Sequence, residues 1–233
     1  MRIEHIGNAT LVLADCMDVM RDMPDNAFKL AIVDPPYGIG ASTMQMGPDY
    51  NSRQWERRSD WDTVAPDQRY FDELRRVSIN QIIWGGNYFK LPISSAWIFW
   101  DKGVGDGMSF ADGELAWSSH KMPLRKVRID HTGFRISEKK IHPTQKPVAL
   151  YKWLLSRYAK PGDTILDTHG GSGSSVIACL DMGYEIMWIE KDPDYFQAAL
   201  KRIKDFAAQP KLPMDDTPDP VEQWLGFEEV GNE

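Results

Sequence analysis

The chain has 233 residues, of which 42% are hydrophobic and 26% charged, so it can bury one full core and we expect one globular domain. It lacks the run of about 18 apolar residues that a membrane span requires, and its first residues lack the apolar core of a signal peptide. The two cysteines, Cys16 and Cys179, fit neither a disulfide framework nor a zinc site. We therefore expect a cytoplasmic protein without a metal centre.

The net charge of −7 is unevenly distributed along the chain. Residues 209–233 form an acidic, proline-rich tail whose composition does not support a core of its own. Residues 121–146 instead carry eight basic side chains against two acidic ones, an excess that would attract phosphates. From composition alone, a solvated charged face explains this excess equally well.

Short apolar runs predict buried strands of a parallel or mixed sheet. These runs are residues 10–14, 30–33, 81–84, 96–100, 164–166 and 186–189. Helices are expected after Pro66, after Pro147, from about Ser174 to Met182, and from Pro193 onward with Asp192 as its cap. Because strands alternate with helices, the sequence predicts an α/β layered domain.

Two long segments, residues 38–63 and 103–141, do not fit the alternation of strands and helices. Loops of such length in a compact domain are usually functional or mobile. Between them, Asp101 and Lys102 end a predicted strand and are expected to form a surface pair. Trp84 ends the predicted strand 81–84, and two interpretations of it stay open, core packing and the wall of a base pocket.

The segment Asp34-Pro35-Pro36-Tyr37 directly follows a predicted strand, and so lies at the carboxyl edge of the sheet, where α/β folds place ligands. The prolines stiffen the turn and remove two backbone donors, which leaves a carboxylate, carbonyl oxygens and an aromatic ring. Such a set suits an exocyclic amine on a planar heterocycle, because Asp34 and the Pro35 carbonyl accept N–H groups while Tyr37 stacks on the ring. A rigid turn without a ligand is the alternative interpretation.

A second motif is the glycine-rich turn that joins the strand 164–166 to a helix. Its sequence is Asp167-Thr168-His169-Gly170-Gly171-Ser172-Gly173-Ser174-Ser175. These small residues let a ligand approach the backbone and the helix N-terminus, although the glycine order differs from the G-x-G-x-x-G of dinucleotide sites. Glu190 ends the next strand, about 20 residues later, where a carboxylate accepts hydrogen bonds from ribose hydroxyls. The motif predicts a site for a nucleoside-containing cofactor.

The third motif, His142-Pro143-Thr144-Gln145-Lys146-Pro147, stands immediately before a predicted helix. Free N–H groups at this helix end, the Thr144 hydroxyl and the Lys146 ammonium together suit a carboxylate. A well-capped helix start explains the same residues without a ligand.

The three motifs, in this order, resemble the β-class amino methyltransferases of DNA, which use S-adenosylmethionine. The resemblance covers most of residues 10–206 and implies a circularly permuted Rossmann-like fold, with a mixed seven-stranded sheet flanked by helices. The strand 10–14, followed by Asp15, would then lie beside the strand that ends at Glu190.

The resemblance also implies a division of the chain into functional parts. A single catalytic domain would span residues 1–208, and a homodimer is common in the family. Within it, we expect a catalytic half at 10–102, a small target-recognition insertion at 103–141, and a cofactor half at 142–208.

By the same resemblance, the protein transfers a sulfonium methyl group directly to N6 of an adenine flipped out of double-stranded DNA, as in restriction-modification systems. The catalytic residues would be Asp34, Pro35, Pro36 and Tyr37. The cofactor-binding residues would be Asp15, Asp34, Thr144, Gln145, Lys146, Asp167, His169, Gly170, Gly171, Ser172, Gly173, Glu190 and Lys191. The DNA-binding residues would be Arg53, Arg57, Arg125, Arg128, Lys139 and Lys140.

Alternatives remain open for the substrate and for activity itself. The aspartate form of the first motif favours adenine N6, and the same chemistry on cytosine N4 is the runner-up. This chain has Thr168-His169 where the family usually has Pro-Phe, so a catalytically silent subunit that binds S-adenosylmethionine or nucleic acid is the alternative from a different class. For His169 itself, a hydrogen-bonded or stacking role is favoured over that of a general base.

Overall fold

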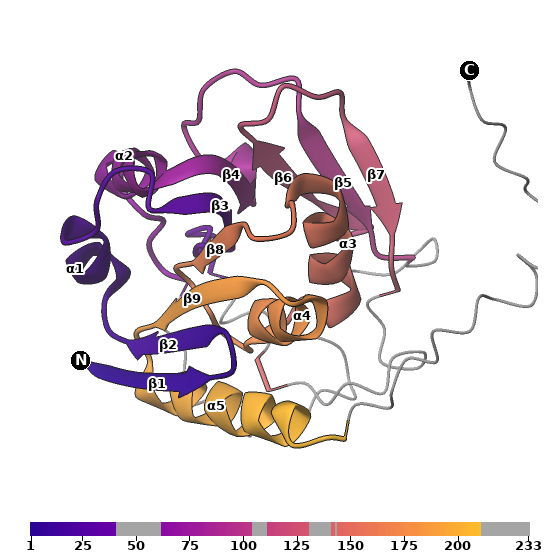
Figure 1. Ribbon diagram of the computed structural model, residues 1–233. Coiled ribbons are helices and arrows are strands. Elements are labelled where there is room, and N and C mark those ends of the chain that lie inside the picture. The colour runs from indigo at the N-terminus through magenta and orange to yellow at the C-terminus, as the bar shows by residue number, and fades with distance from the viewer. Residues whose placement is uncertain (41–61, 104–110, 131–140, 143, 211–233) are drawn as a thin grey trace, which may run out of the picture.

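A computed structural model of the protein describes residues 1–40, 62–103, 111–130, 141–142 and 144–210 (Figure 1). The strands are β1 (Arg2–Ile6), β2 (Ala9–Leu13), β3 (Phe28–Val33), β4 (Ser78–Trp84), β5 (Trp97–Asp101), β6 (Gly113–Ser118), β7 (Arg125–Arg128), β8 (Thr164–Asp167) and β9 (Glu185–Glu190). The helices are α1 (Cys16–Arg21), α2 (Gln68–Val77), α3 (Val148–Tyr158), α4 (Ser174–Met182) and α5 (Pro193–Ala207), with a short 3-10 turn, η3 (Gly86–Tyr88).

The described strands form one mixed sheet in the order β1-β2-β9-β8-β3-β4-β6-β5-β7. The five strands from β2 to β4 in this order are mutually parallel, so their carboxyl ends meet at one edge. The first strands of the chain pair with the last, and Leu13 lies opposite Glu190. The predicted place of residues 10–14 beside the Glu190 strand is therefore confirmed, as is the α/β fold.

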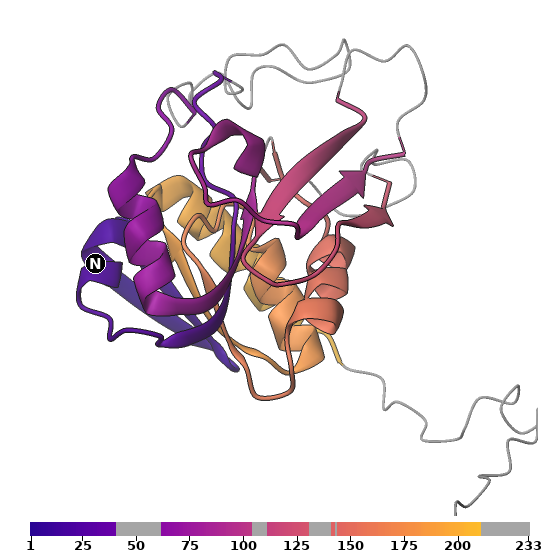
Figure 2. The ribbon, with the colours of Figure 1, turned by 90° about the horizontal axis from the view of Figure 1, so that it is seen from above.

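Two apolar cores cover the opposite faces of the sheet, and Figure 2 shows helices on both sides of it. Helices α3, α4 and α5 pack on one face, and α1 and α2 pack on the other. On α5 the side chains of Phe196, Ala199, Leu200 and Ile203 are fully buried, which is the spacing of one helical face. Asp192 caps this helix, as predicted, because its carboxylate accepts the N–H of Asp194 at 2.8 Å and of Tyr195 at 2.9 Å.

The expectation of seven strands was too low, since the sheet has nine within the described residues. The outer strands β1 and β7 account for the difference. Sequence patterns miss them because each buries little: in β7 only Val127 is buried, between three exposed basic side chains. Helix α1 was missed as well, since six residues are too few to show a periodicity.

The expectation that residues 103–141 form an insertion needs a correction, because this segment contains β6 and β7. Strand β6 pairs with both β4 and β5, inside the sheet. Its buried residues, from Ala116 to Ser118, follow a glycine and a glutamate that hide the strand pattern. The target-recognition role remains a prediction, and residues 104–110 and 131–140 lie outside the described ranges.

None of the helices in the described part of the chain is long and apolar enough to cross a membrane.

Candidate active site

The first two motifs meet at the carboxyl edge of the parallel strands. Strand β3 lies between β4 and β8, and β8 pairs with β9. Asp34 follows β3, the glycine-rich turn follows β8, and Glu190 is the last residue of β9. Parallel neighbours therefore bring these three features, which are far apart in the sequence, to one end of the sheet.

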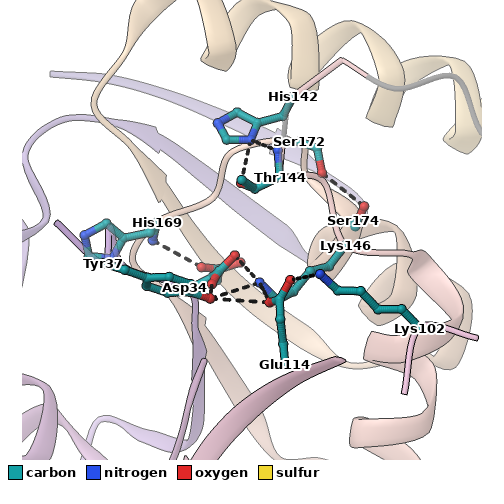
Figure 3. A network of polar contacts seen from close by, with 11 residues as sticks. Asp34, Tyr37, Lys102, Glu114, His142, Thr144, Lys146, His169, Ser172 and Ser174 are labelled. Atoms are coloured by element: carbon teal, nitrogen blue, oxygen red, sulfur yellow. Dashed lines mark hydrogen bonds and ion pairs between the residues drawn. The ribbon is translucent and has the colours of Figure 1, made fainter. Parts of the chain in front are cut away.

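At this edge, Asp34 has two partners that hold its carboxylate (Figure 3). Tyr37 donates its hydroxyl to Asp34 Oδ1 at 2.7 Å, and Lys146 donates from Nζ to Asp34 Oδ2 at 2.5 Å. The Lys146 side chain is 2% exposed and that of Asp34 17% exposed. Lys146 therefore contacts the first motif directly, a contact that its expected role with a cofactor carboxylate did not include.

Two further charged residues complete this cluster, and neither was predicted from the sequence to belong to the site. Glu114, on β6, accepts from Lys146 Nζ at 3.0 Å through Oε2, and Lys102 Nζ lies 2.7 Å from Glu114 Oε1. The predicted surface pair of Asp101 and Lys102 is wrong, because Asp101 instead pairs with Lys126 at 2.9 Å. The sequence signal for this cluster is Lys102, a lysine at the end of a predicted buried strand.

The cluster of Asp34, Lys146, Glu114 and Lys102, hereafter the charge cluster, contains two positive and two negative groups. Burial raises the pKa of Asp34, while Lys146 acts to lower it and Glu114 to raise it. Burial also acts to raise the pKa of Glu114, but the two ammonium groups outweigh it and hold that pKa at about 2. The pKa of Lys146 is raised, since two carboxylates outweigh the effect of burial. The contacts of this cluster thus favour the ionised forms of Glu114 and Lys146, whereas burial opposes the ionised form of Asp34.

Aromatic rings surround the Tyr37 side chain. The Tyr88 ring is stacked on it, with centroids 5.0 Å apart and planes at 15°, and Phe89 meets it edge-on at 6.1 Å. Gly85, at φ +65°, lies against the same ring, and a Cβ there would come within 2.2 Å of Tyr37 Cε1. Trp84 is fully buried in the core, which confirms the packing interpretation for that residue.

The glycine-rich turn is held by Asp167, which is almost fully buried. Its Oδ2 accepts from the Ser175 hydroxyl at 2.6 Å and its Oδ1 from the His169 N–H at 3.1 Å. Burial raises the pKa of Asp167 to about 7, although both hydrogen bonds oppose the shift. At Gly170 a Cβ would lie 2.0 Å from Trp188 Cε2, so only glycine fits between the turn and β9.

Glu190 joins the turn to the start of α5. Its Oε2 accepts the N–H of Gly171 at 2.8 Å, and its Oε1 accepts the N–H of Asp192 at 2.8 Å. Each carboxylate oxygen has two acceptor sites, so each keeps one for the hydroxyl of a ligand. Burial raises the pKa of Glu190, and a hydroxyl that donates a hydrogen bond to its carboxylate would stabilise the ionised form.

The His169 side chain contacts neighbouring side chains of the fold. Its Nδ1 lies 3.0 Å from the Thr168 hydroxyl, and its ring meets Tyr70 edge-on with centroids 5.1 Å apart. Burial lowers its pKa to about 3, so the imidazole is neutral at physiological pH. The prediction of a hydrogen-bonded or stacking histidine is confirmed.

The third motif lies close to the turn but makes mainly local contacts. Thr144 donates its N–H to His142 Nδ1 at 3.3 Å, and Gln145 Oε1 accepts the N–H of Ile141 at 3.0 Å. Pro147 precedes α3 without a side-chain cap, so the capped-helix interpretation is wrong. The His142 ring packs at a tilt of 55° against Tyr195, with centroids 4.4 Å apart, and its Cδ2 would lie 3.8 Å from a Cβ on Gly171.

The remaining predicted cofactor residues lie around the same turn. Ser172 and Ser174 share a hydroxyl contact of 3.1 Å, and Gly173 takes φ +73° before α4. Asp15 caps α1 by accepting the N–H of Met17 at 2.8 Å, and Lys191 is exposed after β9. Their contacts with a cofactor remain predictions.

The predicted DNA-binding residues divide between described and undescribed parts of the chain. Arg125 and Arg128 are exposed on the outer strand β7. Arg53, Arg57, Lys139 and Lys140 lie outside the described residues.

Residues 92–201 match the family model described as DNA methylase. The type II methyltransferase M.HpaI of Haemophilus parainfluenzae is 21% identical over 238 residues, which cover 83% of this chain and 73% of M.HpaI. The predicted family resemblance is confirmed. The match and the relative support a DNA amino methyltransferase of the N6/N4 family.

Solved structures of similar proteins share the fold. The M1.HpyAVI complex with S-adenosylmethionine has a TM-score of 0.52 and 20% identity, over 83% of this chain and 99% of that chain. The PvuII DNA methyltransferase, described as cytosine-N4-specific, has a TM-score of 0.54 and 15% identity, over 86% of this chain and 91% of its own. These similarities confirm the methyltransferase fold.

Proposed function

We propose that this protein methylates the N6 amine of adenine in double-stranded DNA with S-adenosylmethionine as the methyl donor. The observation that carries the proposal is the Asp34 carboxylate. It is oriented by Tyr37 and Lys146 at the sheet edge where the glycine-rich turn and Glu190 also lie. The residues proposed to accept the amine and those proposed to hold the nucleoside thus share one edge.

The glycine-rich turn and Glu190 suit S-adenosylmethionine. Gly171 leaves room beside the backbone, because a Cβ there would find no atom closer than 3.8 Å. The Glu190 carboxylate, fixed by two backbone N–H groups, offers its remaining acceptor sites to the ribose hydroxyls. When bound, the cofactor supplies an electrophilic methyl group.

Asp34 and Tyr37 act on the target amine. Each Asp34 oxygen keeps an acceptor site for an N–H of that amine, which draws electron density toward the nitrogen. The cofactor, held by the glycine-rich turn and Glu190, would supply the methyl group to that nitrogen, and its sulfur would keep the electron pair of the broken S–C bond. The methylated nitrogen would carry a positive charge until it releases one proton to solvent, and the Asp34 carboxylate, held by Lys146, would stabilise this charge. Positioning of the flipped base against Tyr37 supplies much of the remaining acceleration.

Adenine is favoured over cytosine by the first residue of the Asp34-Pro35-Pro36-Tyr37 motif. The resembling family carries aspartate there in adenine N6 enzymes and more often serine in cytosine N4 enzymes. Methylation of cytosine N4 remains the second candidate, since a cytosine-N4-specific enzyme is among the similar structures.

Transfer of labelled methyl from S-adenosylmethionine to mixed-sequence duplex DNA, followed by mass analysis of the nucleosides, tests the proposal. We expect N6-methyladenine. N4-methylcytosine would keep the chemistry and replace the base. Absence of any methylated nucleoside, with cofactor binding demonstrated by thermal shift, would contradict the activity and favour a silent subunit.

A further inference from the structure

We propose that Lys146 and Glu114 are positioning residues that together set the charge state and orientation of Asp34, with Lys102 as the anchor of Glu114. The inference rests on the proposed function only where it concerns methyl transfer. The placement of the four side chains carries it (Figure 3).

The Lys146 ammonium stands between two carboxylates. Its Nζ lies 2.5 Å from Asp34 Oδ2 and 3.0 Å from Glu114 Oε2, and the Trp84 ring lies beneath it at 5.2 Å. With 2% of its side chain exposed, water cannot screen these interactions. A buried ammonium at this distance stabilises the ionised form of a carboxylate strongly.

Glu114 acts on Asp34 in the opposite direction. It competes for the Lys146 ammonium, and it also lies 3.4 Å from the Tyr37 hydroxyl that holds Asp34. Loss of the Glu114 charge would leave Lys146 to Asp34 alone and would remove a negative neighbour. Glu114 therefore keeps Asp34 a better acceptor than a simple ion pair would allow.

Because Lys102 pairs with Glu114, the loss of Lys146 would affect Asp34 more than Glu114. Lys102 lies 2.7 Å from Glu114 Oε1 and is 12% exposed. If Lys146 lost its charge, Glu114 would still have Lys102 as a partner, whereas Asp34 would have no cation among the contacts described. Asp34, and not Glu114, is therefore the carboxylate that takes up a proton when Lys146 is removed.

Titratable groups face Asp34 from every element packed against it. Tyr37 lies on its own loop, and the others are Lys146 before α3, Glu114 on β6, Asp167 at the end of β8, Tyr151 on α3 and Tyr70 on α2. Burial raises the pKa of each tyrosine, so these hydroxyls stay neutral in the working range. Among these groups, Asp167 has a pKa of about 7, so its titration must be distinguished from that of Asp34.

The test is a carbon-13 titration of the Asp34 carboxyl in the full chain without cofactor or DNA. Asp34→Asn and Asp167→Asn assign the two resonances. The variants are Lys146→Met and Glu114→Gln, which preserve side-chain size. Lys152→Met is the matched control, because Lys152 pairs with Asp181 on the exposed surface of α3 and α4.

We expect the Asp34 midpoint to rise by about 1–3 pH units in Lys146→Met and to fall in Glu114→Gln, with no change in the control. Shifts in the same direction, or no shift in either variant, would overturn the inference. If Lys146→Met does not fold, Glu114→Gln decides alone: a fall in the midpoint supports the inference, and a rise or no change overturns it.

Methyl transfer provides the second readout and separates this inference from the proposed function. The acid limb of the pH profile of kcat should move with the Asp34 midpoint in each variant. Methylation with unmoved midpoints would overturn the inference alone. Opposite shifts in the midpoints without any methylation by the unaltered protein would support the charge cluster and contradict the proposed function.

Discussion

The glycine-rich turn and the charge cluster lie at the same edge of the sheet but are built differently. The turn is held by local contacts: Ser175 reaches Asp167 across eight positions and Gly171 reaches Glu190 across 19. In the charge cluster, Lys146 reaches Asp34 across 112 positions. A local motif therefore indicates its own geometry, whereas the environment of Asp34 exists only after the whole sheet has formed.

The largest effect is expected from Asp34→Ala, which alters the charge cluster and leaves the glycine-rich turn intact. We expect a loss of methylation of about 10²–10⁴-fold, because the acceptor for the target amine is removed. Cofactor binding should stay nearly unchanged, since the glycine-rich turn and Glu190 make no described hydrogen bond to Asp34. Rates and a cofactor titration by calorimetry check both parts. Retained turnover would exclude Asp34 as the acceptor.

A smaller effect is expected from Gly85→Ala, which alters only the position of Tyr37. The new Cβ would come within 2.2 Å of the Tyr37 ring, and displacement of that ring by about 1 Å would lower kcat by about 10²-fold. Gly183→Ala is the matched control, because Gly183 also has a positive φ, +79°, but nothing within 4 Å.

Both glycine variants should lose about 1–2 kcal/mol of unfolding free energy from backbone strain alone. Only Gly85→Ala should lose activity in assays at matched folded concentration. Equal activity in the two variants would mean that Tyr37 has no defined place in the reaction.

These contrasts also show how far the sequence could be interpreted. The six predicted strands and four predicted helices are present, because continuous apolar runs mark the buried strands and apolar residues mark the helices. Strand β7 was missed because one buried valine cannot show a period. Glu114 was missed for another reason: nothing near it in the sequence reveals that β6 places it beside Lys146 and Lys102.

On the cofactor side, Glu190→Ala should weaken S-adenosylmethionine binding by about 1–3 kcal/mol, because ribose hydroxyls would lose a buried acceptor. The N–H groups of Gly171 and Asp192 would lose theirs as well, so the melting temperature should fall too. Glu185→Ala, at the exposed start of the same strand, is the control. Unchanged affinity in Glu190→Ala would place the ribose elsewhere.

The smallest effects are expected on the surface, where Arg125 and Arg128 were both predicted to bind DNA. Strand β7 runs parallel to β5, with Ile98 opposite Arg125 and Asp101 opposite Arg128. Because Lys102 follows Asp101 and belongs to the charge cluster, Arg128 lies at the edge that holds the active site. Arg125 lies at the other end of the strand. We therefore expect the two arginines to differ in their distance from a bound duplex.

We accordingly expect Arg128→Ala to weaken DNA binding a few-fold and to reduce the slope of log affinity against log salt by about 0.9, the loss of one phosphate contact. Arg125→Ala should change either quantity less. Anisotropy titrations of a labelled duplex at several salt concentrations measure both, with Lys152→Ala as the control for a lost surface charge. If Arg125→Ala had the larger effect, DNA would approach from the opposite end of β7, and Asp34 could not be the residue that meets the flipped base.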